Sequence, residues 1–363
     1  QKTIDPTFVL NLAPNGDFDF EKWSTSTKET VARTDSSASI VSDSSIGRRS
    51  LQHTLNVDSS TPLSEIQRRP WIVGHRGCLY DELENTREGF MKSADMGADA
   101  VELDVFLLKC GTLIVFHGGG ADENPGHLLD YCGVNKGILE LTYAEALELT
   151  FNPNYSEFGC PASKTLSGWI PTLEQVLIDA KESGLHVKVE LKGPGTVEPT
   201  LEVVERLDMT SQCSYASFDK DRIAHLRRLR PDKLGYPTGA LFNDVPQDYI
   251  EQAERAGATE IHLRYDTCTK DTVSDVHQAG FGSMAWFRGP IGMASDCQER
   301  FWDVGNEDES MYDLLLRTGV QQMCVNRPDV LVRYRQKILA TYSNEDLVVM
   351  SDPQPMFNTT MAH

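Results

Sequence analysis

The stretch AVELDVFLLKCGTLIVFH, residues 100–117, decides the fold. It contains two apolar runs typical of buried strands, and the segment between Asp104 and His117 is too short for the helix that a parallel crossover needs. We therefore expect an antiparallel hairpin that turns at Cys110-Gly111. Such a two-residue turn would place His117 directly opposite Asp104.

Outward from this hairpin, strand-like runs alternate with helical patterns. The strand-like runs are residues 71–75, 100–105, 113–117, 186–192, 214–218, 234–241, 259–263, 282–286 and 322–326. Repeated strand–helix units indicate a parallel sheet with helices on its outside. One of these nine runs, residues 113–117, is the returning arm of the hairpin. The other eight match the eight strands of a (β/α)8 TIM barrel, an α/β fold.

The remaining segments are interpreted as additions to this barrel. We predict that the barrel covers residues 66–338, with a hairpin and loop insertion at about residues 118–170, after the second strand. Residues 1–65 contain short β-like pieces, including residues 50–55, and are expected to form an N-terminal β-rich arm. Residues 339–363 are expected to form a C-terminal tail.

The charge of the chain limits its partners. The sequence has 34 Lys and Arg against 54 Asp and Glu, a formal net charge of −20. Such a field repels polyanions, which argues against nucleic acid or an anionic membrane as the main partner. No apolar run is long enough to span a bilayer, so no transmembrane segment is expected.

Three features favour a secreted glycoprotein. The chain begins at Gln1, it has eight cysteines without a C-x-x-C pair, and Asn154 and Asn358 each begin a glycosylation sequon. An even number of cysteines fits disulfides in an oxidising compartment, although a chain of this length does not need them. We expect the mature chain to follow removal of a signal peptide.

Carboxylates follow apolar runs at the ends of two expected strands. Glu102 and Asp104 point to the same side of one strand, and Glu190 lies near the end of the next parallel one. Adjacent carboxylates repel one another, and oxygen ligands of this kind suit a hard divalent cation such as Ca²⁺ or Mg²⁺. Glu190 alone fits a surface salt bridge equally well. Three inward carboxylates are different, because burying them unpaired would cost several kcal/mol each.

Several motifs, taken together, resemble a known family. They are His75-Arg76-Gly77, Glu84-Asn85-Thr86, Glu102-x-Asp104, His117, Glu190-x-Lys192, Ser217-Phe218 and Trp286. In order and spacing they are similar to the pattern of glycerophosphodiester phosphodiesterases over roughly residues 70 to 335.

The resemblance implies roles for these residues. Residues like Glu102, Asp104 and Glu190 bind one divalent metal ion in that family, and residues like His75 and His117 form the acid–base pair. Residues like Arg76 and Lys192 hold the phosphate. Trp286 ends a strand, where it either stacks on the glycerol or head group or packs at the top of the barrel.

Two departures from the family pattern matter. The family usually has an aspartate after its second histidine, where this sequence has Gly118. The glycines that follow His117 either bring backbone N–H groups towards phosphate or form a flexible turn. The insertion contains Cys132 and Cys160, for which the hypothesis is a disulfide that closes a loop over the site.

The resemblance implies hydrolysis of soluble glycerophosphodiesters, such as glycerophosphocholine and glycerophosphoethanolamine, to an alcohol and glycerol 3-phosphate. We assign His75 as base and His117 as acid. One alternative is a phospholipase D-like enzyme that acts on lysophospholipids or sphingolipids through peripheral lipid contact. Its apolar rim would include Leu128, Leu129, Tyr131, Ile138 and Leu139. The other alternative is an inactive barrel that serves as a binding or surface protein.

Overall fold

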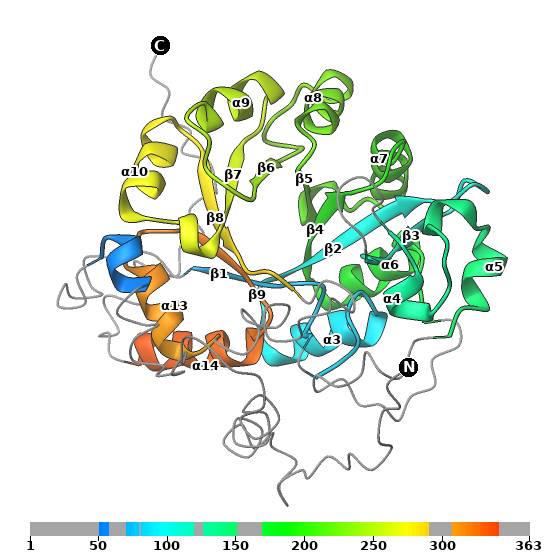
Figure 1. The fold of residues 1–363 in the computed structure, drawn as a ribbon, viewed down its shortest axis with the longest axis horizontal. Helices are drawn as coiled ribbons and strands as arrows, with labels where there is room; N and C mark the ends of the chain where they lie inside the picture. The colour runs from blue at the N-terminus through cyan, green and yellow to red at the C-terminus, as the bar shows by residue number, and fades with distance from the viewer. Residues whose placement is uncertain are drawn as a thin grey trace, which may run out of the picture. The chain divides into compact units, whose positions relative to one another are not determined.

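Eight parallel strands form a closed ring, and helices surround it (Figure 1). The computed structural model describes residues 51–57, 70–79, 81–119, 126–150, 169–289 and 307–340. The strands of the ring are β1 (Trp71–Gly74), β2 (Ala100–Leu107), β4 (His186–Leu191), β5 (Cys213–Ser217), β6 (Thr238–Phe242), β7 (Glu260–Arg264), β8 (Gly282–Trp286) and β9 (Gln322–Val325). Strand β1 pairs with both β9 and β2, which closes the ring and confirms the (β/α)8 TIM barrel.

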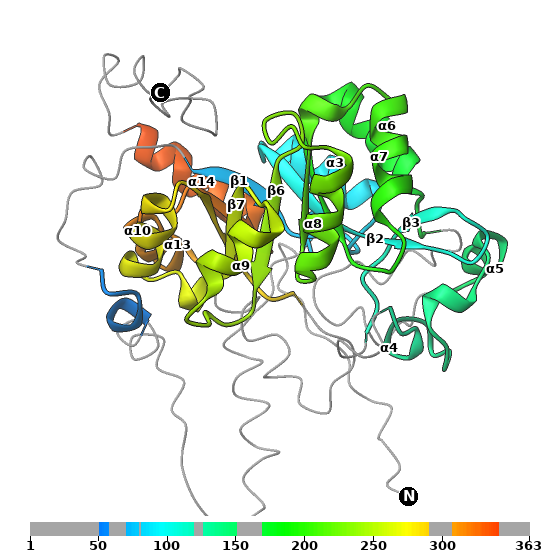
Figure 2. The same cartoon turned by 90° about the horizontal axis from the view of Figure 1, so that it is seen from above.

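A helix follows each strand of the ring before the next one begins, as Figure 2 shows from above. These helices are α3 (Arg87–Met96), α6 (Leu173–Ser183), α7 (Val197–Arg206), α8 (Lys220–Leu229), α9 (Tyr249–Ala256), α10 (Lys270–Gln278), α13 (Glu309–Leu316) and α14 (Pro328–Leu339). Short 3-10 turns η4 (Thr210–Gln212) and η5 (Tyr265–Thr267) precede β5 and follow β7. Thr86 and Thr172 accept a bond from the third backbone N–H of the helices that they begin, which fixes those starts.

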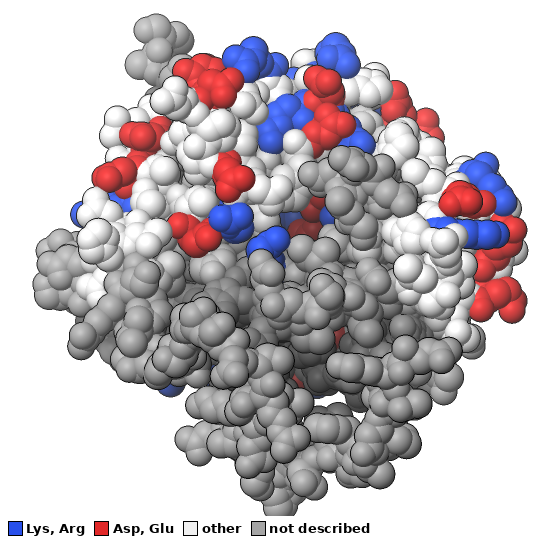
Figure 3. Space-filling view, viewed as in Figure 1, with Lys and Arg blue, Asp and Glu red and all other residues white. Residues whose placement is uncertain are grey.

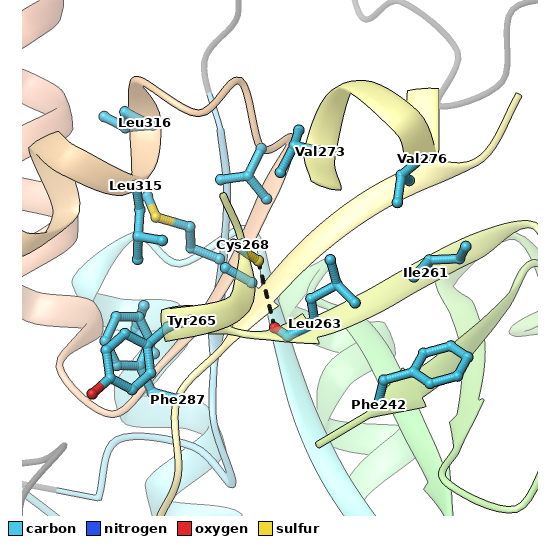
Figure 4. Packing of buried hydrophobic residues seen from close by; sticks show 14 of the residues in the cluster. Phe242, Ile261, Leu263, Tyr265, Cys268, Val273, Val276, Phe287, Leu315 and Leu316 are labelled. Carbon is cyan, nitrogen blue, oxygen red and sulfur yellow. Dashed lines mark hydrogen bonds between the residues drawn. The ribbon is translucent and has the colours of Figure 1, made fainter. Parts of the chain in front are cut away.

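The apolar core lies between the strands and the helices. Figure 4 shows one part of it, where side chains of β7, α10 and α13 pack together. Tyr265 stacks on Phe287 with ring centroids 4.6 Å apart. Burial of such side chains stabilises the barrel by roughly 25 cal/mol for each Å² of apolar surface removed from water.

The hairpin forms as expected, but its register is shifted by one residue. Strand β3 (Leu113–Val115) runs antiparallel to β2, and Val105 pairs with Val115. The residue opposite Asp104 is therefore Phe116 and not His117. The backbone N–H of Phe116 donates to the Asp104 carbonyl. The expected two-residue turn was wrong, because the loop contains three residues and ends on Gly111 in the left-handed region, at φ 85°.

The described part of the insertion covers the outer end of this hairpin. It contains α4 (Leu129–Cys132), η2 (Ile138–Glu140) and α5 (Tyr143–Leu147). Leu128, Tyr131 and Ile138 are completely buried against Phe106 and other hairpin residues. These three residues therefore do not form the apolar rim that the phospholipase D-like alternative requires, because the hairpin needs them as its own core. Leu129 is 48% exposed.

Other expectations for the additions have mixed outcomes. Residues 51–55 are helical rather than extended, since Leu51 and Leu55 share one helical face that packs on the core. Cys132 carries a free thiol, so the structure does not contain its expected bond to Cys160. Cys160, both sequons, residues 1–50 and residues 341–363 lie outside the described residues. Among the described residues, no helix has both the length and the apolar character to cross a bilayer.

Candidate active site

Three carboxylates meet at the carboxyl ends of neighbouring strands. One oxygen from each of Glu102, Asp104 and Glu190 lies within 4.8 Å of the others, and all three side chains are buried. The sheet register explains this, because Asp104 of β2 pairs with Glu190 of β4. Figure 3 shows acidic and basic side chains next to one another in a recess of the molecule.

The electrostatics of these carboxylates fit a cation. Burial and the neighbouring Asp104 and Glu190 raise the pKa of the Glu102 carboxyl well above its ordinary value. Burial and the charge of Asp104 likewise raise the pKa of Glu190. Three buried oxygen donors that repel one another are a donor set typical of Ca²⁺ or Mg²⁺ sites, so the residues present fit such an ion.

Two basic side chains border the carboxylates. The Lys192 ammonium lies 3.1 Å from Asp104 Oδ1 and 3.4 Å from Glu190 Oε1, and Arg76 Nε lies 3.6 Å from Asp104 Oδ2. Burial by itself would raise the pKa of Asp104, but Lys192, His117 and Arg76 together hold it below its ordinary value. Asp104 is therefore ionised, and both cations are placed to bind an anionic group beside it.

Arg76 is held in an unusual backbone conformation by its neighbours. Its φ of 50° lies in the left-handed region, which a non-glycine residue rarely adopts. Its N–H donates to Glu102 Oε2 at 3.1 Å, and its guanidinium lies 3.3 Å from Glu84, whose carboxylate also accepts from Tyr131 Oη at 2.9 Å. This strained position directs the side chain over the carboxylates.

His75 follows β1 and lies between an amide and a carboxylate. Its Nδ1 is 2.7 Å from Asn326 Oδ1, and its Nε2 is 3.8 Å from Glu102 Oε2. Burial, followed by the charge of Arg76, lowers the pKa of His75 to about 3, so the ring is neutral near pH 7. A Cβ on Gly289 would lie 3.0 Å from His75 Cε1, so a larger residue in that loop would press on the ring.

His117 follows β3 and is held by the next residue. Its Nδ1 lies 2.6 Å from the Gly118 carbonyl oxygen. Burial, together with the charges of Arg76 and Lys192, lowers the pKa of His117. The negative charge of Asp104 raises this pKa, but by less. The charges of Arg76, Asp104 and Lys192 act on the pKa of both His75 and His117, so both rings lie near these three side chains.

Two further side chains of the barrel, Trp286 and His262, have contacts of their own. The Trp286 ring contacts Phe218 edge-on at 5.5 Å, and its Nε1 donates to the Phe242 carbonyl at 3.2 Å, so it forms part of the barrel rim. His262 is buried inside the barrel, where its Nε2 lies 2.7 Å from Glu260. Burial lowers the pKa of His262, and its contacts give it a structural role in the interior.

The sequence left three contributors to the site without a role. Asn326 could have been found by the rule used for the others, because it directly follows the end of β9. Glu84 belongs to a motif that was recognised without a function. Tyr131 was interpreted as part of a lipid-contacting rim, and no pattern in the sequence connects it to Arg76.

Comparisons with known proteins point to one family. Residues 75–330 match the model of the Glycerophosphoryl diester phosphodiesterase family. A glycerophosphodiester phosphodiesterase of Bacillus altitudinis is 30% identical over 213 residues, 57% of this chain and 81% of the relative. YqiK of Bacillus subtilis, an uncharacterised protein, is 30% identical over 165 residues, 44% of this chain and 63% of its own length.

Solved structures share the fold. A candidate glycerophosphodiester phosphodiesterase of Galdieria sulphuraria is similar with a TM-score of 0.59 and 25% identity, over 74% of this chain and 98% of that one. An Oleispira antarctica phosphodiesterase, solved with the product sn-glycerol-3-phosphate, has a TM-score of 0.59 and 20% identity, over 75% of this chain and all of that one.

Proposed function

The chain belongs to the glycerophosphoryl diester phosphodiesterase family, and from this premise we propose that it hydrolyses glycerophosphodiesters to an alcohol and glycerol 3-phosphate. Its class is that of a phosphoric diester hydrolase. One observation carries the proposal, namely that three buried carboxylates, two cations and two histidines surround a single centre.

The mechanism follows from the charge of the substrate. A phosphodiester is an anion that repels nucleophiles, so Arg76 and Lys192 bind its phosphoryl oxygens and offset the charge that redistributes in the transition state. Glu102, Asp104 and Glu190 would hold one divalent cation, Ca²⁺ or Mg²⁺, which when bound supplies further positive charge beside those oxygens.

The two histidines move the protons. Nε2 of His75 accepts a proton from the attacking hydroxyl group, which belongs either to water or to the glycerol of the substrate. His117 donates a proton to the oxygen of the leaving alcohol as the bond from phosphorus to that oxygen breaks. Burial, Arg76 and Lys192 lower the pKa of His117, and the negative charge of a bound substrate would favour the protonated ring that this role needs.

Glycerophosphocholine and glycerophosphoethanolamine are the proposed substrates. The buried state of Leu128, Tyr131 and Ile138 supports a water-soluble diester over a membrane lipid. A human lysophospholipase D, GDPD1, is 26% identical over 134 residues, so lysophospholipids belong in the same assay. A secreted location remains a proposal that rests on the even number of cysteines and the two sequons.

The test is turnover of glycerophosphocholine with and without exhaustive chelation. We expect chelation to abolish turnover and Ca²⁺ or Mg²⁺ to restore it, and His75→Ala and His117→Ala each to lower kcat by about 10²–10⁴-fold. His225→Ala is the matched control, because His225 lies half-exposed on α8 beside Glu198. Full turnover in metal-free protein would overturn the cation site. Turnover of lysophospholipids alone would replace the proposed substrate class, and no turnover of any diester would favour a binding protein.

A further inference from the structure

We propose that Glu307 is a positioning residue for the catalytic histidine His75, and that it acts by orienting the amide of Asn326. The oriented amide fixes the His75 proton on Nδ1 and leaves Nε2 as the free nitrogen. The effect on turnover rests on the proposed function, whereas the position of the proton does not.

The Asn326 amide can point in only one direction. Its Nδ2 donates to Glu307 Oε1 and, at 2.9 Å, to the Arg288 carbonyl. Both amide hydrogens are thus used on acceptors. A flipped amide would place its oxygen against these two acceptors, which is unfavourable for both contacts. The atom that faces His75 is therefore the amide oxygen, Oδ1.

This orientation decides the tautomer of His75. Oδ1 of Asn326 lies 2.7 Å from His75 Nδ1 and can only accept, so Nδ1 must carry the hydrogen. In a neutral imidazole the other nitrogen, Nε2, then has the lone pair. A group that accepts a proton from the attacking hydroxyl needs that arrangement.

Glu307 is itself fixed by surrounding donors. Its Oε2 accepts from the backbone N–H of Asn326 at 2.9 Å and from Tyr312 Oη at 2.7 Å, and only 5% of the residue is exposed. The backbone N–H of Arg327 also points at this oxygen, at 3.3 Å. With Oε2 occupied in this way, Oε1 is available for the Asn326 amide. An ionised carboxylate accepts at both oxygens, so only donors can face it.

The test replaces the carboxylate with an amide of the same shape. In Glu307→Gln the new oxygen has to accept from the donors that now bond Oε2, so its NH₂ group faces Asn326 Nδ2. Two donors then oppose each other. A flip of the Asn326 amide relieves this contact at the expense of its bond to the Arg288 carbonyl, and we expect the flip to move the His75 proton to Nε2. We expect kcat to fall roughly 10- to 100-fold with KM nearly unchanged, because general-base catalysis is worth about 10²–10⁴-fold.

A second substitution should reverse the effect. In Glu307→Gln/Asn326→Asp, the aspartate accepts from the new amide on one side and from His75 Nδ1 on the other. We expect the double variant to be more active than Glu307→Gln alone, a non-additive result that simple loss of packing does not give. Glu309→Gln is the matched control, because Glu309 lies two residues away and is exposed beside Lys337.

The tautomer is measured directly by ¹⁵N NMR of the histidine ring. Protonation of Nδ1 in the wild-type protein, of Nε2 in Glu307→Gln and of Nδ1 again in the double variant would support the proposal. Nε2 protonation in the wild type, or an unchanged ring in Glu307→Gln, would overturn it. Because this signal needs no substrate, an inactive wild type with the expected tautomers would reject the proposed function and leave the positioning role intact.

Discussion

Gly118 shows how a single residue can hold the ring of His117, the proposed acid. Its carbonyl accepts from His117 Nδ1, it has φ 69°, and a Cβ there would lie 2.6 Å from the Phe116 ring and 2.7 Å from Gly126 Cα. A side chain at this positive φ costs about 1–2 kcal/mol, even without the two close contacts. We expect the backbone in Gly118→Ala to relieve this strain by moving, which displaces the carbonyl from His117 and lowers kcat at least tenfold. Steady-state kinetics with a melting curve measure both effects.

The control for this prediction is Gly111→Ala at the hairpin tip. Gly111 also has a positive φ, 85°, but no atom lies within 4 Å of a Cβ built there. Gly111→Ala should therefore lose only the stability that the positive φ costs, which is less than the loss in Gly118→Ala, and it should keep its kcat. An equal loss of kcat in both variants would contradict a specific role for the Gly118 carbonyl.

The described cysteines should differ strongly in reactivity. Cys110 is exposed, and its hydrogen bond with Thr112 lowers the pKa of the thiol, whereas burial raises the pKa of Cys78 and Cys213 to about 12. Because the thiolate is the reactive form, iodoacetamide near pH 8 should modify Cys110 first among the described cysteines, and faster as the pH rises. Peptide mass spectrometry measures the order, and earlier modification of Cys213 would contradict it.

At the residue scale, the sequence predicted the charged members of the site and missed the residues that orient them. Glu102, Asp104 and Glu190 were identified because they follow apolar runs, and a parallel barrel brings strand ends together. The role of Asn326 depends on which way an amide points, and no sequence pattern contains that information.

At the scale of elements, the insertion contributes to the site through α4. Tyr131 of this helix donates to Glu84, and Glu84 pairs with Arg76. We expect Tyr131→Phe to lower kcat/KM about tenfold, because a hydrogen bond to a charged group is worth about 1.5–3 kcal/mol and its loss loosens Arg76. Kinetics on glycerophosphocholine check this.

Tyr143→Phe is the control from the same insertion. The Tyr143 hydroxyl donates to the Ile170 carbonyl at 3.4 Å, and not to a carboxylate that pairs with Arg76. Equal kinetics for the two variants would show that the insertion acts only as a cover and that the Tyr131 hydroxyl does not support Arg76.

The hairpin shows the limit of prediction for elements. Chain length between Asp104 and His117 correctly excluded a crossover helix, because this is a matter of geometry. The register was wrong by one residue, because two- and three-residue loops both fit a glycine at the tip, and the packing of Phe106 and Phe116 under the insertion selects between them.

At the scale of the whole molecule, a buried ionic group lies inside the barrel. Lys188 Nζ is 3.1 Å from Glu260 Oε2, which also lies 2.7 Å from His262, and all three side chains are almost completely buried. Glu260→Gln leaves Lys188 without its counter-charge and should lower the free energy of unfolding by about 3–5 kcal/mol. Urea denaturation measures this.

The exposed pair Glu174–Arg206 is the control for that measurement. Both side chains are about half exposed, so Glu174→Gln should change the free energy of unfolding by less than about 1 kcal/mol. A similar small change in Glu260→Gln would mean that Lys188 finds another partner, and the ionic group would then contribute little to the stability of the barrel.

The closure of the ring by β1 has a consequence for the timing of synthesis. His75 leaves the ribosome early, and the amide that orients it follows 251 residues later, directly after the strand that closes the ring. A nascent chain therefore has no completed centre until Asn326 has been made and β9 has paired with β1. Since β9 is the last strand of the ring in chain order, the centre is completed only when synthesis of the barrel is nearly finished.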